Sequence, residues 1–359
     1  MADPRDIRRV AAKGDAFAIG QAMGRAAAAD IRERSFVTTE FKALKARWLG
    51  SDYLGRLEAA ARNHYPAFVR EIEGIADGAG LDFPSVFMWN CRGDLRLPED
   101  ASAAERARAA EGCTTIMIPP AGDAPAVIAH NEDGAPELLG HCFWVEAEPD
   151  DGPAFQSFMY PGMLPGHTLG LNAAGIVQTI NNIRVHDLKP GIPRHVVCRA
   201  VLAASTMEDA LAVLTRPDRA SGFHHNLGSA REGRLCSVEA PASGCRVREI
   251  AAPSAHANHL IEPEFAGLAQ EVTGSSRDRQ QSADALVSAQ PPKSAADAEG
   301  ILFERETPIY RANDAGDDYS QTLCTGVFEL HRDRVDWRLH ASPANRSALA
   351  GSLGVHQGA

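Results

Sequence analysis

The sequence predicts an α+β protein in which a helical N-terminal segment precedes a core of antiparallel sheets covered by helices. Residues 16–48 are rich in Ala, Arg, Glu and Lys, with apolar side chains at helical spacing. From Cys113 onward, short apolar runs alternate with Pro, Gly, Asp and Asn, which is typical of strands joined by turns. The strands come in consecutive groups and the later helices in pairs. This order favours antiparallel sheets over a doubly wound parallel sheet.

The predicted elements follow from local composition and turn residues. Before residue 100, helices are predicted at residues 16–48, 52–63, 66–77 and 84–95. Later helices are predicted at residues 193–204, 205–215, 276–288 and 294–304. Strands are predicted at residues 113–118, 126–130, 142–148, 155–160, 168–172, 176–181, 223–229, 235–239, 246–250, 322–330 and 335–340. The polar, Ala-rich residues 97–111 indicate a surface linker or a mobile helix.

Charge and cysteine content disfavour several classes of protein. The 359 residues carry 47 acidic and 36 basic side chains, and they lack the basic cluster typical of nucleic-acid binding. No apolar run is long enough to span a bilayer, and the first ten residues lack the apolar centre of a secretory leader. We therefore expect a cytoplasmic protein that binds neither nucleic acid nor membrane. The seven cysteines form no CxxC pair, which argues against a disulfide framework, a zinc ribbon or a redox motif.

Motifs for cofactors are missing from the sequence. The adjacent histidines His224 and His225 point to opposite faces of a strand, and no HExxH pair occurs, so we expect no metal. There is no GxGxxG after a strand and no Walker A loop, so we expect no nucleotide cofactor. The lack of a GxSxG elbow argues against a serine hydrolase.

The step from Gly112 to Cys113 has the residue types needed for self-cleavage. Gly112 can adopt backbone angles closed to other residues, and the Cys113 thiol could attack the Gly112 carbonyl to give a thioester that water hydrolyses. The freed α-amine of Cys113 could then act as base for its own thiol. Strand alternation puts Thr115 on the same face as Cys113. The alternative is that Cys113 simply begins a buried strand.

Five motifs follow one another in order along the chain. They are Glu111-Gly112-Cys113-Thr114-Thr115, His130-Asn131-Glu132-Asp133, Gly170–Ile176, Leu188–His195 and His256-Ala257-Asn258-His259. In order and spacing they resemble the motifs of the isopenicillin-N acyltransferase family, which belongs to the N-terminal-nucleophile hydrolases, and the first of them resembles the processing site of that family. The motifs cover about residues 113–259, while the helical N-terminal part matches only in character.

The resemblance implies a four-layer α/β/β/α sandwich and cleavage into residues 1–112 and 113–359, which stay associated. It implies that Cys113 is the nucleophile, that Asp133 orients its α-amine with Asn131 beside it, and that Asn258 donates to the oxyanion. From the residues alone, Asp133 could instead begin a turn and Asn258 could make a strand-end backbone hydrogen bond.

Substrate contacts are predicted less specifically. The apolar loop of residues 160–166, with Tyr160, Met163 and Leu164, could line the pocket or form a tight connection. Asn181 and Arg184 could bind substrate or cap a strand. Thr325 stands where the penicillin-forming member has an arginine, which argues against that member's substrate. Because Thr cannot hold a carboxylate through a bidentate charged pair, we expect hydrolysis to dominate over transfer.

Three functions remain open from the sequence. The first is a cysteine amidohydrolase acting on a linear amide or N-acyl amine. The second is an acyltransferase that moves an acyl group from a thioester or amide to an amine, and the third is a binding domain without catalysis. The expected partners are a small-molecule amide or acyl donor and the two pieces of the chain itself. A homo-oligomer is neither predicted nor excluded.

Overall fold

The computed structural model describes residues 7–96, 112–307, 309–312, 320–341 and 348–356. The linker predicted at residues 97–111 lies outside these ranges. Before residue 97, the chain forms strand β1 (Arg8–Gly14) and helices α1 (Ala16–Asp30), α2 (Thr39–Trp48), α3 (Asp52–His64), α4 (Pro66–Ala79) and α5 (Phe83–Asn90). The later helices are α7 (Arg194–Leu202), α8 (Met207–Leu214), α9 (Gly274–Ala289) and α10 (Ala295–Leu302).

The helix predicted at residues 16–48 is divided in two. A π-helical turn, Ile31–Ser35, follows α1, and the chain then restarts as α2. A local hydrogen bond fixes the start of α2. The Thr38 hydroxyl accepts it from the Phe41 amide and thereby caps the N-terminus of the helix.

Glycines bring α1 and α4 into backbone contact. Gly20 and Gly24 lie on α1, and Gly74 and Gly78 lie on α4. A Cβ atom at Gly20 would lie 1.9 Å from the Glu71 carbonyl oxygen, and one at each of the other three would meet backbone atoms at 2.1–2.2 Å. Only glycine therefore permits this approach of the two helices.

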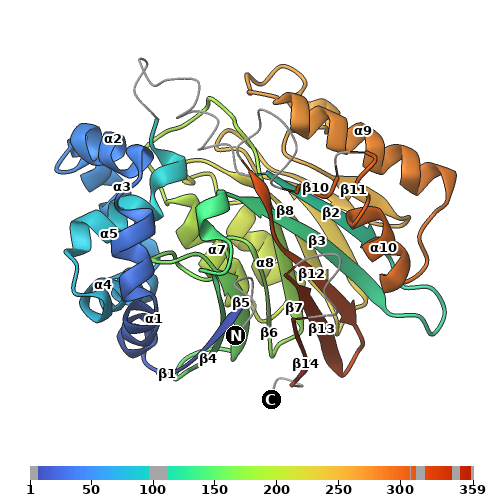
Figure 1. Cartoon of the computed structure of the whole chain (residues 1–359), viewed down its shortest axis with the longest axis horizontal. Coiled ribbons are helices and arrows are strands. Elements are labelled where there is room, and N and C mark those ends of the chain that lie inside the picture. Colours follow the sequence, from blue (N-terminus) through green and yellow to red (C-terminus); the bar gives the residue numbers. More distant parts are fainter. Residues whose placement is uncertain (1–6, 97–111, 308, 313–319, 342–347, 357–359) are drawn as a thin grey trace.

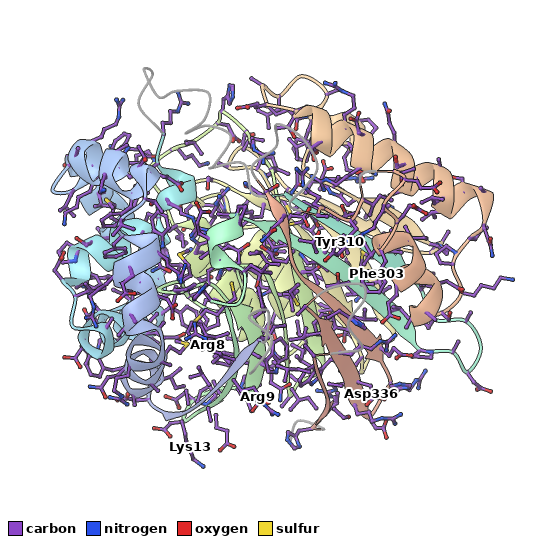
Figure 2. All side chains as sticks on the ribbon, viewed as in Figure 1. Arg8, Arg9, Lys13, Phe303, Tyr310 and Asp336 are labelled. Atoms are coloured by element: carbon purple, nitrogen blue, oxygen red, sulfur yellow. The ribbon has the colours of Figure 1, made fainter. Side chains whose placement is uncertain are left out.

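Strand β1 was not predicted, so the expectation of an entirely helical N-terminal segment is wrong for residues 8–14. β1 pairs in parallel with β4 (Phe143–Pro149). Its Val10 and Ala12 side chains are buried, while Arg9 and Lys13 point outward and pair with Glu146 and Glu148 of β4 (Figure 2). The burial of alternate side chains and the cross-strand ion pairs explain why this charged segment forms an edge strand.

Two sheets form the core. Sheet A has the strand order β1-β4-β5-β6-β7-β8-β9-β10, and sheet B has the order β11-β2-β3-β12-β13-β14. The remaining strands of sheet A are β5 (Phe155–Met159), β6 (Leu169–Asn172), β7 (Ile176–Asn182), β8 (Phe223–Ser229), β9 (Arg234–Glu239) and β10 (Arg246–Glu249). Sheet B consists of β2 (Gly112–Ile118), β3 (Ala126–Gly134), β11 (Ser254–His256), β12 (Gln321–Leu330), β13 (Arg334–His340) and β14 (Leu349–Gly354). The sequence did not predict β14.

The four-layer α/β/β/α arrangement is confirmed (Figure 1). The two sheets face each other across a buried apolar layer that includes Leu169 and Leu171 of sheet A and Ile128 and Phe328 of sheet B. Helices α9 and α10 pack on the outer face of sheet B, while α7 and α8 pack on sheet A. The N-terminal helices share the main core with the sheets, so residues 7–96 do not form a separate domain. No helix among the described residues is long and apolar enough to cross a bilayer.

Candidate active site

Cys113 lies near the start of β2, between the two sheets. Cys113 pairs with Glu132 of β3, and Thr115, which is two residues later in β2, pairs with His130 of β3. Thr115 contacts Asn181 of β7 and Asn226 of β8, so the face of β2 that carries Cys113 and Thr115 points toward sheet A. All of these side chains are buried. The predicted alternation of Cys113 and Thr115 is confirmed.

A carboxylate lies next to the thiol. The Sγ atom of Cys113 is 3.7 Å from Oε2 of Glu132, whose Oε1 accepts a hydrogen bond of 2.5 Å from the Tyr160 hydroxyl. Burial, and then the charges of Glu132 and Asp133, raise the pKa of the Cys113 thiol well above its usual value, while Arg279 acts in the opposite direction. The thiol is therefore protonated at neutral pH.

A chain of hydrogen bonds connects sheet A to Glu132. Asn226 donates to the Thr115 hydroxyl over 3.0 Å, and that hydroxyl lies 2.8 Å from Nδ1 of His130. Nε2 of His130 lies 3.1 Å from Oε2 of Glu132. Burial and the charge of Arg279 lower the pKa of His130 to about 3, so the ring is neutral. A neutral His130 ring completes this series of hydrogen bonds when the Thr115 hydroxyl donates to Nδ1 and Nε2 donates to the Glu132 carboxylate.

Asn258 and Arg279 hold the backbone of Cys113. The Cys113 amide donates to Oδ1 of Asn258 over 2.7 Å, and Nδ2 of Asn258 donates to the Asn182 carbonyl over 3.0 Å. Arg279 of α9 donates to Oδ1 of Asn258 over 2.7 Å, to the Thr114 hydroxyl over 2.9 Å, and to the Cys113 carbonyl. The amide oxygen of Asn258 thus faces the backbone nitrogen of Cys113. Its predicted role as an oxyanion donor stays a prediction.

Asp133 and Asn131 lie on the other face of β3. Asp133 pairs with Gly112 in the register of the strands and accepts a hydrogen bond of 2.7 Å from the Thr322 hydroxyl. Asn131 donates to the Leu302 carbonyl of α10 over 2.8 Å, and its side-chain oxygen accepts from the Thr325 hydroxyl over 2.6 Å. Asn131 and Thr325 therefore bond to each other and connect sheet B to α10. The roles predicted for Asp133, Asn131 and Thr325 stay predictions.

The predicted substrate contacts fall into two groups. Tyr160 contacts Glu132, and Asn181 contacts Thr115, so both lie beside the residues that surround Cys113, and their role as substrate contacts stays a prediction. Met163 and Leu164 are fully buried. The Met163 sulfur accepts a hydrogen bond from Arg92, and the Leu164 amide donates one to Asn90. The loop at residues 160–166 thus forms a packed connection from which Tyr160 reaches the site.

A cavity of about 450 Å³ lies beside Asn182, the residue whose carbonyl accepts from Asn258. Its wall carries more positive than negative side chains. The charged residues that line it are Arg47, Arg92, Arg96, Arg184 and Arg194, with Glu40 and Glu271. This excess of arginine gives the cavity a positive potential that favours anionic groups.

Sequence reasoning missed three residues of the site. Glu132 and His130 stand within a motif that the resemblance highlighted, and strand pairing opposite Cys113 could have identified both. Arg279 stands on a helix far along the chain, and no sequence pattern connects it with Cys113. The ligand atoms of Cys113, His130 and Glu132 lie within 4.8 Å of one another, although the sequence predicts no metal site.

Comparison with known proteins identifies the family. The family model described as acyl-coenzyme A:6-aminopenicillanic acid acyl-transferase matches residues 120–344, more than half of the chain. The β-alanyl-dopamine/carcinine hydrolase of Drosophila melanogaster is 29% identical over 323 residues, covering 81% of this chain and 79% of that protein. The 40 kDa form of acyl-coenzyme A:6-aminopenicillanic-acid-acyltransferase from Emericella nidulans is 24% identical over 212 residues, which are 58% of this chain and 56% of that protein.

Among solved structures, a mutant of the conjugated bile acid hydrolase from Clostridium perfringens aligns with 68% of this chain and 97% of its own. The identity is 10% and the TM-score is 0.43. The match over residues 120–344 together with the ordered motifs around Cys113 leads to one conclusion. The chain belongs to the acyl-coenzyme A:6-aminopenicillanic acid acyl-transferase family.

Proposed function

We propose that the chain is a self-cleaving amidohydrolase whose nucleophile is Cys113, acting on a small N-acyl amine through an acyl-enzyme. The observation that carries this proposal is the environment of Cys113. Its thiol is buried beside polar side chains between the sheets, and its backbone nitrogen is held by Asn258. Family membership and the named activities of the two relatives support an enzyme that acts on C–N bonds.

Self-cleavage begins with attack of the Cys113 sulfur on the Gly112 carbonyl carbon. The S–C bond forms, the Gly112–Cys113 C–N bond breaks, and the thiol proton passes to the departing nitrogen. Water then hydrolyses the thioester, which frees the thiol and leaves a carboxylate on Gly112. Hydrogen bonds from Arg279 to the Cys113 carbonyl and to Thr114 fix the strand after the cut.

Turnover uses the same sulfur with a new base. An unperturbed α-amine has a pKa of roughly 7.7–8.0, so an α-amine freed at Cys113 can accept the thiol proton near neutral pH. The thiolate attacks the substrate amide, the amine leaves with a proton, and water releases the acid from the thioester. Oδ1 of Asn258 can hold the α-amine, while Nδ2, which carries two hydrogens, can donate one to the oxyanion.

The printed activity of the Drosophila relative supports a small substrate, and so does the cavity beside Asn182, which is near Cys113 through Asn258 although Cys113 is not in its lining. A cavity of about 450 Å³ fits a small molecule better than a folded polypeptide. That relative is named for hydrolysis of β-alanyl-dopamine and carcinine. We extend amide hydrolysis, and not those particular substrates, to this chain.

Acyl transfer is the second candidate, and the arginine-lined cavity favours it. The expectation of dominant hydrolysis rested on Thr325 in place of an arginine, yet Arg184 and Arg194 line the cavity and could hold the carboxylate of an acceptor. Hydrolysis remains our prediction. The assay supplies an N-acyl substrate with rising amine and measures acid against amide product. Amide product in excess at low millimolar amine would identify a transferase.

Intact mass of the purified protein tests the proposal before any substrate is known. We expect two associated pieces, residues 1–112 and 113–359, of roughly 12 and 26 kDa by length. The larger piece should begin with an unmodified Cys113. An active protein that remains a single chain of 359 residues would disprove the proposed base.

A further inference from the structure

We propose that Glu239 is a positioning residue that, together with His256, holds the side chain of Asn258 against the backbone nitrogen of Cys113. The inference rests on the proposed function, since it takes Cys113 as the nucleophile and Asn258 as the group that serves it. A buried carboxylate that the proposed mechanism leaves unused thereby gains a role in turnover.

Strand β11 ends just before it would reach the nucleophile. Its last residue, His256, pairs with Thr115 of β2, and the same antiparallel register would place Asn258 opposite Cys113. Because the strand stops at His256, the Cys113 amide donates to the side-chain oxygen of Asn258 over 2.7 Å. A backbone carbonyl is fixed by its strand, whereas a side-chain oxygen keeps its place only if the segment that carries it is held.

Glu239 holds that segment on both sides of Asn258. It is the last residue of β9 in sheet A, and its side chain is fully buried. Oε1 lies 3.0 Å from Nε2 of His256 and accepts from the Ile261 amide over 2.7 Å, while Oε2 accepts from the Glu262 amide over 3.2 Å. One carboxylate thus closes a loop of the chain that has Asn258 inside it.

Helix α9 holds the same loop from the other side. The Ser276 hydroxyl accepts from the Asn258 amide over 2.9 Å, and Oε1 of Gln280 accepts from the Ala257 amide over 2.7 Å. Loss of Glu239 would therefore free the loop on the side of sheet A and leave its contacts with α9 in place.

Glutamine cannot replace Glu239 in this arrangement. Both carboxylate oxygens accept from backbone amides, and glutamine has an NH2 group in place of one oxygen. In either orientation of a glutamine side chain, one backbone N–H would face another donor. The loop would then open on one side, and Asn258 would lose its fixed position at the Cys113 nitrogen. Because a misplacement of about 1 Å can cost on the order of 100-fold in rate, we expect Glu239→Gln to lower kcat by about 10- to 100-fold, with KM changed much less.

A double-mutant cycle separates positioning from stability alone. The kcat per mole of cut chain is measured for the wild type, Glu239→Gln, Asn258→Ala and the double variant. If Glu239 acts through Asn258, Glu239→Gln should change kcat by no more than about twofold in the Asn258→Ala background, which is the usual error of such cycles. The matched control is Glu71→Gln, because Glu71 is also a fully buried carboxylate and pairs with Arg199 between α4 and α7. This control should lose stability and keep kcat within about twofold of the wild type.

A second pair of variants tests the contact from the side of His256 and does not depend on whether Glu239→Gln folds. His256→Leu keeps an apolar side chain in the loop but removes the hydrogen bond to Glu239. His256→Gln has an NH2 group that can donate to the carboxylate in place of Nε2. We expect kcat of His256→Gln to exceed that of His256→Leu by about tenfold or more, the range for a hydrogen bond to a charged group.

The outcomes separate this inference from the proposed function. An equal loss of kcat from Glu239→Gln with and without the Asn258 side chain would overturn the inference, because Glu239 would then not act through Asn258. Wild-type kcat in Glu239→Gln or in Asn258→Ala would overturn it as well. Each of these results leaves the nucleophile standing if the wild type is cut after Gly112 and Cys113→Ala is inactive. A wild type that neither cuts itself nor hydrolyses any amide would refute the proposed function itself.

Discussion

Replacing Asn258 by aspartate or by alanine separates two roles that its side chain can have at Cys113. Aspartate keeps an oxygen for the Cys113 nitrogen and for Arg279, but it has no N–H to donate. Alanine removes both functions. If Nδ2 donates to the oxyanion, both variants should lose about 100- to 1000-fold in kcat, with KM changed much less.

The stability of the two variants should differ. Alanine leaves two donors without this acceptor, the buried Cys113 amide and one N–H of Arg279. Each buried unpaired group costs about 1–3 kcal/mol, so we expect the free energy of unfolding to fall by about 2–6 kcal/mol. Aspartate keeps the acceptor and should destabilise the protein less than alanine does, which makes it the more informative variant.

The assay measures kcat per mole of cut chain, after intact mass has established the cut fraction. Asn172→Asp is the matched control, because the Asn172 side chain is equally buried and makes hydrogen bonds to backbone groups at the β6–β7 turn, at the end of α7 and just after α7. The control should lose stability but keep kcat. An Asn258→Asp enzyme with kcat within tenfold of the wild type would refute the oxyanion role and leave Asn258 only as the holder of the α-amine.

Three further perturbations have defined outcomes. Cys113→Ala should abolish both self-cleavage, measured by intact mass, and turnover, measured by activity. The control Cys198→Ala should lower the free energy of unfolding by only about 1–3 kcal/mol. Residual turnover in Cys113→Ala would exclude Cys113 as the nucleophile. Gly20→Ala should destabilise the protein by about 1–3 kcal/mol in urea unfolding because its Cβ meets backbone of α4, whereas Gly55→Ala, with open space around it, should be neutral or stabilising. The pKa of buried Asp94 is raised from 3.8 to about 6, so the stability that it contributes is complete below pH 3.8 and is lost as pH rises to about 6. Relative to Asp94→Asn, the free energy of unfolding of the wild type should therefore fall by about 3 kcal/mol across that pH range. A difference between the two proteins that does not vary with pH would contradict the assignment of this effect to Asp94.

The helices and strands were largely predictable because each depends mainly on the residues within and next to it. Alternation and turn residues identified most strands from Cys113 onward, and prolines and hydroxyl caps identified the helices. β1 was missed because Arg8–Gly14 contains only two buried apolar side chains, and its partner strand lies some 135 residues further along the chain.

The site was predictable only where it follows from alternation or from motifs. Cys113 and Thr115 share a face of one strand, which the sequence predicts directly. Arg279 reaches Cys113 only because α9 packs on the outer face of sheet B, and no local pattern contains that information. Glu132 was overlooked because the motif drew attention to its neighbours Asn131 and Asp133, although only Glu132 shares the face of the thiol.

The pairing of β1 with β4 has a consequence for how the protein can be produced. If the chain is cut after Gly112, β1 belongs to the small piece and β4 to the large one, so the small piece completes the sheet of the large one by strand donation. Residues 113–359 expressed alone would expose the backbone of β4 along Phe143, Trp144 and Val145, an apolar edge that can template aggregation. We expect the large piece to remain monodisperse only when the small piece is supplied with it.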